Sequence, residues 1–294
     1  HKVFEEVREQ AQKRGMRVTG SELVGLIPLD ALLGAGRYFL NKQNKSTAVS
    51  DNQLIHIAVK SLGLDEMYPF DKNEKIIEYL IDTDSKLIDK TIIDFVDEVS
   101  MDSPAPGGGS VAALLGALGA GLSSMVAALT HEKKEMFDSK SEMDEIGVEA
   151  QILKDRLVKL VDEDTNAFNS VMIANRLPAN TEDEQKQKVE AIEAANKYAI
   201  EVPMKTAKLC MKVLKLSDML VKNGNPNSVS DAGVSAEVAL AGVSGAYMNV
   251  LINLSGIDDN GYVKIKRKAI EDLLLEAKTL RKSVFIKTIK IIES

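Results

Sequence analysis

The chain has 294 residues, of which 45% are hydrophobic and 28% are charged, and its formal net charge at pH 7 is -7. This length and composition are typical of a soluble globular protein that buries a sizeable core without disulfide bonds. The acidic balance and the dispersed basic residues exclude nucleic acid and an acidic membrane surface as partners.

The first 43 residues predict a helix, a short β-branched stretch and a second helix. The first helix is amphipathic over VFEEVREQAQKRG, the stretch RVTGSELVGLIP predicts a strand, and the second helix follows Pro28, a residue that suits a helix start. Because one strand is not stable alone in water, we expect its sheet partners in missing residues or in another chain. The chain also starts at His1 without a Met. We therefore expect residues 1–43 to be a truncated α/β remnant of a longer polypeptide.

Residues 44–86 predict a helical linker. The polar run NKQNKST opens this stretch, and two short helical patterns follow it, at residues 51–62 and 73–81. Turn residues separate the two patterns, which favours a connector over an independent domain.

From Leu87 to the C-terminus almost every segment has the period and composition of a helix, which predicts an all-α, up-and-down helical bundle over residues 87–294. Capping and breaking residues separate the helices: Thr181 and Glu184 form a capping box, and Pro203 interrupts the next long pattern. The expected helices span residues 89–99, 109–131, 141–174, 181–202, 204–222, 230–254 and 262–292.

Residues 103–130 carry no charge, and that length could suggest a membrane span. Ala, Gly and Ser dominate the segment, Pro and Gly interrupt its start, and no basic flank orients it, so we expect a buried helix and no membrane span. Small residues recur at helical spacing here and in the helix after Asp231. These two helices are therefore expected at the centre of the bundle.

Asp164 is the sharpest candidate for chemistry. Within VDEDTNAF it occupies a position on the apolar face that runs from Leu153 to Val171, so its carboxylate points inward, whereas Asp162 and Glu163 fall off that face and are expected in solvent. An apolar setting raises a carboxyl pKa and prepares the group to donate a proton near neutral pH. The alternative is a structural aspartate that a neighbouring helix satisfies.

The segment SPAPGGGS directly precedes the uncharged helix. It lacks the lysine and the preceding strand of a nucleotide P-loop, but it can present bare backbone N–H groups at a helix N-terminus to an anionic or carbonyl-rich ligand. The candidate binding residues of this segment are Pro106, Gly107, Gly108, Gly109 and Ser110.

A second polar loop, NGNPNSVSDAG, precedes the other small-residue helix. Ser230 or Asp231 can be explained as a helix N-cap, or the loop can face a ligand through Asn225, Ser230 and Asp231. Farther along, Asn249 and Asn253 lie four residues apart in an apolar helix, where two amides need partners, either in a neighbouring helix or in a polar ligand.

Cysteine and histidine are too sparse to support a metal site. Cys210 is the single cysteine, which excludes internal disulfides and every site made of several cysteines. His1, His56 and His131 are scattered, and we predict no metal. A chain with one cysteine fits the reducing cytoplasm.

Four motifs occur in order between Leu87 and the C-terminus: SPAPGGGSVAALLGALGA, VDEDTNAFNSVM with RLP, GNPNSVSDAGV and GAYMNVLINL. In these the chain resembles the cyclodeaminase domain of the formiminotransferase-cyclodeaminase family. The earlier RVTGSELVGLIPLDALL and LGLDEMYPF resemble the tail of the family's formiminotransferase domain and its linker.

The resemblance implies a lyase that converts 5-formimidoyltetrahydrofolate to 5,10-methenyltetrahydrofolate and ammonia in histidine degradation and one-carbon metabolism. It implies a folate substrate with one or more glutamates, a helical bundle that forms a homodimer or a larger ring, and a proton donor at Asp164, the second aspartate of DxDxxAF. It also implies that the glycine segment lies against the pterin, opposite Asn225, Ser230 and Asp231. The transferase's catalytic histidine lies upstream in the family, so formimino transfer is not expected of this chain.

Two other functions stay open. A methenyltetrahydrofolate cyclohydrolase would use a similar helical scaffold with water as the attacking group. A non-catalytic oligomerisation module would use the small-residue helices only as a dimer seam.

Overall fold

The computed structural model describes residues 1–81, 86–133, 136 and 139–294. The chain divides into two compact units, residues 1–85 and residues 86–294, and each is described by itself.

The first unit contains five helices among its described residues: α1 (Lys2–Gln12), α2 (Leu29–Lys42), α3 (Asp51–Leu62), α4 (Lys72–Lys75) and α5 (Ile77–Ile81). Its core lies mainly between α2 and α3, where Leu32 and Leu54 are fully buried. The start of α3 is a capping box between Ser50 and Gln53, and its end is a left-handed Gly63.

The strand expected over residues 17–28 is wrong, because the described residues of the first unit contain no strand. Residues 18–27 contribute one isolated parallel bridge, in which Ile27 N–H donates to Lys75 O (2.9 Å) and Ile77 N–H donates to Ile27 O (3.1 Å). Elsewhere in this stretch, Ser21 N–H donates to Gly63 O (3.0 Å) and the Ser21 hydroxyl donates to Leu62 O (2.6 Å). The pairing stops there because no neighbouring extended segment continues the ladder. The same bridge holds Ile76 in an extended conformation, which divides the helix expected over residues 73–81 into α4 and α5.

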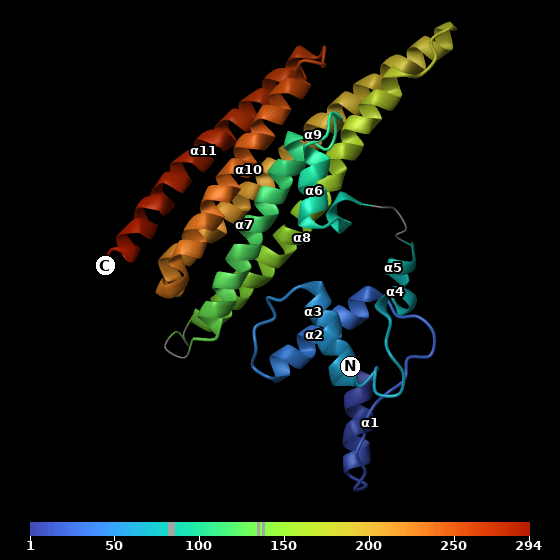
Figure 1. Ribbon diagram of the computed structural model, residues 1–294, viewed down its shortest axis with the longest axis vertical. Coiled ribbons are helices and arrows are strands. Elements are labelled where there is room, and N and C mark those ends of the chain that lie inside the picture. Colours follow the sequence, from blue (N-terminus) through green and yellow to red (C-terminus); the bar gives the residue numbers. More distant parts are fainter. Residues whose placement is uncertain (82–85, 134–135, 137–138) are drawn as a thin grey trace. The chain divides into compact units, whose positions relative to one another are not determined.

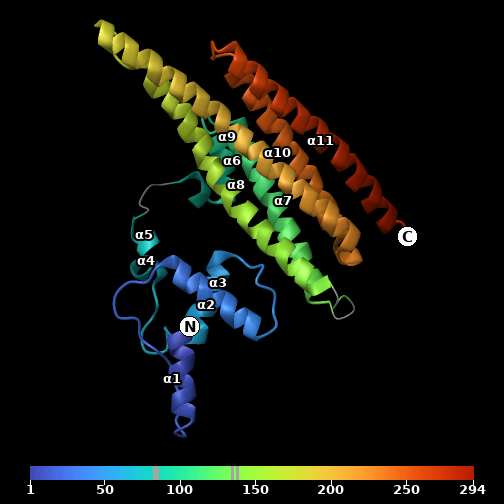
Figure 2. The same ribbon diagram turned by 180° about the vertical axis from the view of Figure 1, so that it is seen from behind.

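The second unit confirms the expected all-α bundle. A short turn of 3-10 helix, η1 (Leu87–Asp89), and α6 (Ile92–Val99) precede the long helices α7 (Gly108–His131), α8 (Lys140–Asn175), α9 (Glu182–Asn223), α10 (Val229–Leu254) and α11 (Asn260–Ile292). Each long helix packs against the next along the chain, and α7 also packs against α10 (Figure 1). Seen from behind, α9 runs along the bundle between α8 and α10 (Figure 2).

Pro203 does not end a helix, in contrast to the expected break between residues 202 and 204. It lies inside the continuous α9, where its missing N–H leaves the Ala199 carbonyl without an intrahelical donor. The Asn253 amide of α10 donates to that carbonyl (2.6 Å) and so satisfies it. A tertiary hydrogen bond thus allows the helix to continue.

The α7–α10 contact is as close as the small residues predicted. A Cβ added to Gly242 of α10 would lie 2.9 Å from the Ala112 carbonyl oxygen of α7, and one on Gly245 would lie 2.9 Å from the Ala112 side chain. Both helices are long and apolar enough to cross a membrane by length and composition alone. The most apolar window is 56% buried within the bundle in α7 and 39% buried in the segment that contains α10.

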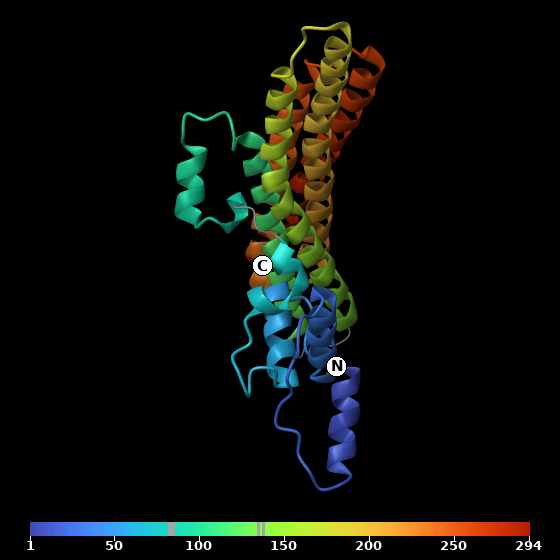
Figure 3. The ribbon, with the colours of Figure 1, turned by 90° about the vertical axis from the view of Figure 1, so that its right-hand side faces the viewer.

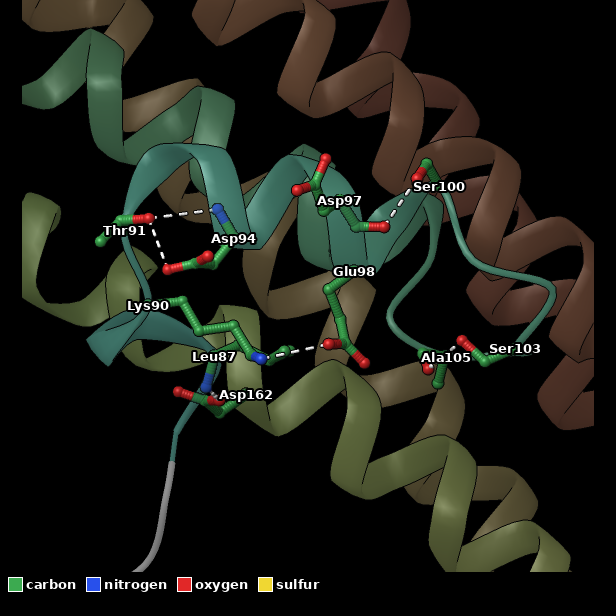
Figure 4. Close-up of polar contacts among 10 residues, drawn as sticks. All are labelled: Leu87, Lys90, Thr91, Asp94, Asp97, Glu98, Ser100, Ser103, Ala105 and Asp162. Carbon is green, nitrogen blue, oxygen red and sulfur yellow. Dashed lines mark hydrogen bonds and ion pairs between the residues drawn. The ribbon is translucent and has the colours of Figure 1, made fainter.

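The segment before α7 forms an arm, residues 87–107, which contains η1, α6 and the first part of the glycine segment, residues 103–110. The rest of the glycine segment forms the start of α7. In Figure 3 the part with α6 stands apart from the long helices. Its first end is fixed where Leu87 N–H donates to Asp162 Oδ1 of α8 (2.7 Å), and Thr91 caps α6 through the Asp94 N–H (Figure 4). The C-terminal end of the arm continues directly into α7. The glycine segment is therefore held by α7 on one side and by the contact of Leu87 with α8 at the other end of the arm.

Candidate functional site

A cavity of about 300 Å³ lies where the start of α7 meets the end of α10. Its walls come from the arm, α7, α8, α9 and α10. The lining residues that carry the argument below are Gly107, Gly108, Gly109, Asp164, Phe168, Asn196, Asn249 and Asn253. The structure therefore brings the glycine segment, Asp164 and Asn253 together in one place.

Asp164 is the only carboxylate among the described residues that line this cavity. Its position follows from the register of α8, in which Leu160 is fully buried one turn earlier and Leu157 is fully buried two turns earlier. Burial raises the pKa of the Asp164 carboxyl, and hydrogen bonds from the backbone and the hydroxyl of Ser110 oppose that shift in part. A carboxyl with a raised pKa beside an open cavity is suited to donate a proton.

Ser110 lies beneath Asp164 and does not line the cavity. Its side chain is fully buried, and its hydroxyl donates to the Val161 carbonyl (2.8 Å) while lying 3.4 Å from Asp164 Oδ2. The residue therefore positions the carboxyl, whereas the sequence suggested a contact with the ligand.

The three glycines have different neighbours. A Cβ on Gly109 would overlap both oxygens of the Asp164 carboxyl. A Cβ on Gly108 would lie 3.5 Å from Asn249 Nδ2, and one on Gly107 would lie 3.7 Å from Pro104 O, which are ordinary contacts. Position 109 therefore requires a glycine, because any side chain there would collide with the Asp164 carboxyl. At positions 107 and 108 the absence of a side chain leaves free space at the cavity wall.

Three amide side chains line the wall opposite Asp164's helix, and each has its nitrogen engaged by a backbone carbonyl. Asn196 donates to Gly256 O (2.9 Å), Asn249 to Gly245 O (2.9 Å) and Asn253 to Ala199 O (2.6 Å). These bonds fix the amides and leave their oxygens as acceptors. Asn249 and Asn253 therefore serve the fold and line the cavity at once.

Asn225, Ser230 and Asp231 do not reach this cavity within one chain. They follow the end of α9, where Asn225 N–H donates to Thr130 Oγ1 (2.9 Å) near the end of α7. The Asn225 side chain caps the short helix η3 (Pro226–Ser228) through the Asn227 N–H (3.1 Å). The N-cap of α10 is Ser228, so capping by Ser230 or Asp231 was a wrong interpretation.

Two further expectations change on the structure. Pro106 is buried and is not among the residues that line the cavity. Asp162, expected in solvent, accepts the Leu87 N–H through one oxygen, and its other oxygen is buried without a partner among the described residues. Asp162 therefore holds the first end of the arm, and neither residue lines the cavity.

Asn196 and Phe168 were missed as candidate site residues. Phe168 follows Asp164 by one helical turn, so the register that found the aspartate contained the signal for it. Asn196 had no such signal, because only the packing of α9 against α10 brings it to the cavity. Among the described residues no group of three or more His, Cys, Asp or Glu side chains could hold a metal ion.

Comparison with protein families gives two adjoining matches. Residues 91–272 match the formiminotransferase-cyclodeaminase family, and residues 1–82 match the formiminotransferase domain.

Individual relatives agree with these matches. The formimidoyltransferase-cyclodeaminase of Rattus norvegicus is 39% identical over 282 residues, which cover 95% of this chain and 52% of that protein. The chain thus spans about half the length of this relative. A methenyltetrahydrofolate cyclohydrolase of Methylorubrum extorquens is 36% identical over 196 residues, which cover 67% of this chain and 94% of that protein.

A solved structure matches the bundle. The formiminotetrahydrofolate cyclodeaminase from Thermotoga maritima superposes with a TM-score of 0.59 at 29% identity, and the match covers 71% of this chain and 98% of that one.

Proposed function

Because this chain belongs to the formiminotransferase-cyclodeaminase family, we propose that its helical unit is a formimidoyltetrahydrofolate cyclodeaminase. The reaction converts 5-formimidoyltetrahydrofolate to 5,10-methenyltetrahydrofolate and ammonia. The observation that carries the proposal is the Asp164 carboxyl, which has a raised pKa and lies at the wall of a cavity beside the glycine segment.

The chemistry requires one bond to form and one to break at the formimino carbon. N10 of the folate attacks this carbon and loses its proton, and the carbon–nitrogen bond to the former imino group breaks, with its electron pair leaving on ammonia. The formimino group reacts as its cation, whose terminal nitrogen already carries two hydrogens, and neutral Asp164 donates the third, so that this nitrogen leaves as ammonia. The carboxylate that results can accept the proton from N10, so one group returns to its starting state.

The remaining cavity residues bind and orient the substrate. Gly107 and Gly108 present backbone without side chains at the wall, where a flat ring can approach closely. Phe168 offers an aromatic face, and the oxygens of Asn196, Asn249 and Asn253 can accept hydrogen bonds from ring N–H groups. No metal is needed for these roles.

The active form in this proposal is a homodimer. One surface of the bundle, the α7/α10 face, carries the exposed side chains of Leu118, Met125 and Leu129 on α7 and of Val234, Met248 and Ile252 on α10. Two adjacent helices of this length present about 700 Å². A standard interface buries about 800 Å² per partner, so the face has the size that a stable dimer needs.

An ammonia-release assay tests the function. The protein is expected to release ammonia from 5-formimidoyltetrahydrofolate with the appearance of the methenyl product. Hydrolysis of 5,10-methenyltetrahydrofolate without ammonia release would instead support the cyclohydrolase function, which the Methylorubrum relative favours. If the protein does not bind a folate analogue in a titration, both enzyme functions are excluded, and the non-catalytic oligomerisation module is the function that remains.

The wider setting is also a proposal. The match of residues 1–82 to the formiminotransferase domain supports a parent protein that transfers the formimino group as well. Such a protein would act in histidine degradation, in the cytoplasm, and could assemble beyond the dimer into a ring.

A further inference from the structure

The Asn249 side chain makes a hydrogen bond that the fold does not need. Its Nδ2 donates to Gly245 O (2.9 Å), the carbonyl four residues earlier in α10. In a regular helix that carbonyl already accepts the backbone N–H of residue 249, so the side chain is a second donor. Asn253 differs, because it satisfies the Ala199 carbonyl that Pro203 leaves without a donor. Removal of the Asn249 side chain therefore leaves no backbone group unsatisfied.

The bond nevertheless fixes the direction of the Asn249 amide. A nitrogen that donates to a carbonyl identifies which end of the amide is the oxygen, and no described residue donates to that oxygen. The side chain is half-buried and lines the cavity, and its oxygen is not one of the described polar atoms that are buried without a partner. The oxygen is therefore accessible and presents its lone pairs to the cavity as an acceptor.

Asn249 and Asp164 meet the glycine segment at neighbouring residues. A Cβ on Gly108 would lie 3.5 Å from Asn249 Nδ2, and a Cβ on Gly109 would overlap the Asp164 carboxyl. The Cα atoms of neighbouring residues are about 3.8 Å apart. The amide and the carboxyl are therefore within reach of one small ligand group.

The two other amides of the cavity lie farther from the glycine segment. Asn253 follows Asn249 by one turn of α10, about 6 Å at the rise of an α-helix. Asn196 donates to Gly256 O (2.9 Å), beyond the C-terminal end of α10. These two amides remain available for the ring N–H groups of the substrate, whereas Asn249 lies beside the proton donor.

The side chains around the cavity favour a ligand group that is cationic and rich in N–H. None of the described lining residues is Lys, Arg or His, and the one carboxyl among them is Asp164. The Ser255 hydroxyl, like the three amides, donates to a backbone carbonyl (Ile252 O, 2.6 Å). These bonds occupy donors and leave acceptor oxygens open. A formimino cation carries two hydrogens on its terminal nitrogen, whereas a formyl group ends in an oxygen without hydrogen.

We propose that Asn249 selects the formimino group of the substrate. Its amide oxygen accepts a hydrogen bond from the terminal N–H of that group, and the same contact holds this nitrogen beside the Asp164 carboxyl. The inference rests on the proposed cyclodeaminase function. A 5-formyl group in the same place would bring its oxygen against the amide oxygen, and two acceptors with no hydrogen between them repel. Asn249 is thus a specificity-determining residue that favours 5-formimidoyltetrahydrofolate over 5-formyltetrahydrofolate.

Stopped-flow binding of the two folates tests this selection. The titrations use the Asp164→Asn protein, in which turnover is slower than binding. In this background Asn249→Leu is expected to weaken binding of the formimidoyl compound about ten- to a hundredfold, the effect of losing a hydrogen bond to a charged group, and to leave binding of the formyl compound within about threefold. An equal loss for both ligands, or no loss for either, would overturn the proposal.

Two companion variants separate recognition from structure. Asn249→Asp keeps an acceptor oxygen and is expected to keep the preference for the formimidoyl ligand, because a carboxylate accepts the same hydrogen bond. Loss of the preference in this variant would contradict the assignment. If circular dichroism shows that Asn249→Leu does not fold, Asn249→Ala takes its place, and the same selective loss is required.

Asn175→Leu is the matched control. The Asn175 amide donates to Val171 O (2.8 Å), four residues earlier in α8, so it makes the same local bond as Asn249, but it is exposed and does not line the cavity. Its removal is expected to leave the binding of both folates unchanged.

Failure of this inference and failure of the proposed function give different results. If the wild type releases no ammonia from 5-formimidoyltetrahydrofolate, the function fails, and the binding preference still decides the role of Asn249. If the wild type releases ammonia but Asn249→Leu affects the two folates equally, the function stands and the inference fails. An absence of binding by either folate overturns both.

Discussion

Gly109 lies directly against the carboxyl group of Asp164, and a Cβ at position 109 would overlap both carboxyl oxygens. The close approach explains why a glycine begins the buried part of α7. It also makes the position of the proposed proton donor, Asp164, depend on a residue in a different helix.

Gly109→Ala is therefore expected to displace the Asp164 carboxyl and to lower kcat about a hundredfold, the effect of a misplacement of about 1 Å. Gly108→Ala is the matched comparison, because its Cβ makes only an ordinary contact with Asn249. We expect this second variant to raise KM more than it lowers kcat. Equal kinetics in the two variants would show that the fit between Gly109 and Asp164 does not matter for turnover.

Asp164→Asn is expected to lower turnover about a hundred- to ten-thousandfold, the usual contribution of a positioned acid. The affinity for a folate analogue and the helical circular dichroism should stay near the wild-type values. Glu163→Gln is the control, since Glu163 forms a surface ion pair with Lys205 (3.1 Å) and does not line the cavity. Unchanged ammonia release by Asp164→Asn would remove this residue from the mechanism.

The pH dependence of kcat follows from the raised pKa of Asp164. Because the neutral form donates the proton, kcat should be constant at low pH and fall as pH rises through that pKa. Ser110→Ala removes a hydroxyl that favours the ionised form, so the descending limb should move to higher pH. A limb that moves to lower pH in Ser110→Ala would contradict this account of the shift.

Stability should depend on pH through the same group. The folded-state pKa of Asp164 is above the unfolded value, so ionisation is harder in the folded protein and stability is lost as pH rises through the folded pKa. Asp164→Asn should therefore melt at a higher temperature than the wild type near neutral pH, with the difference shrinking in acid. Thermal melts at several pH values check the sign, and an advantage that grows in acid would refute it.

Asn253 and Pro203 should couple in a double-mutant cycle. Asn253→Ala leaves the Ala199 carbonyl unsatisfied, at a cost of about 1–3 kcal/mol in the free energy of unfolding. In a Pro203→Ala background the new backbone N–H can bond to that carbonyl, so the same change should cost much less. Urea denaturation of the four proteins measures the coupling, and additive effects would mean that Asn253 does not support the helix in this way.

The spacing of apolar residues predicted the bundle helices because each long helix buries one apolar face. Such a face produces apolar residues at intervals of three and four along the sequence. The same register identified Asp164, since a carboxylate on an apolar face is conspicuous. It could not identify Asn196, whose place at the cavity depends on how α9 packs against α10. It also misplaced the break at Pro203 and the solvent exposure of Asp162, because a residue from a different segment satisfies each of them.

The helical class of residues 87–294, the central position of the two small-residue helices and the inward aspartate were determined by the sequence alone, because side-chain pattern along one helix is a local property. Which residues meet across helices was decided only by the tertiary structure. The glycine segment and Asp164 meet in one cavity, whereas Asn225, Ser230 and Asp231 lie a helix length away. The physical reason is that contacts between distant segments depend on helix direction and crossing, which no local pattern specifies.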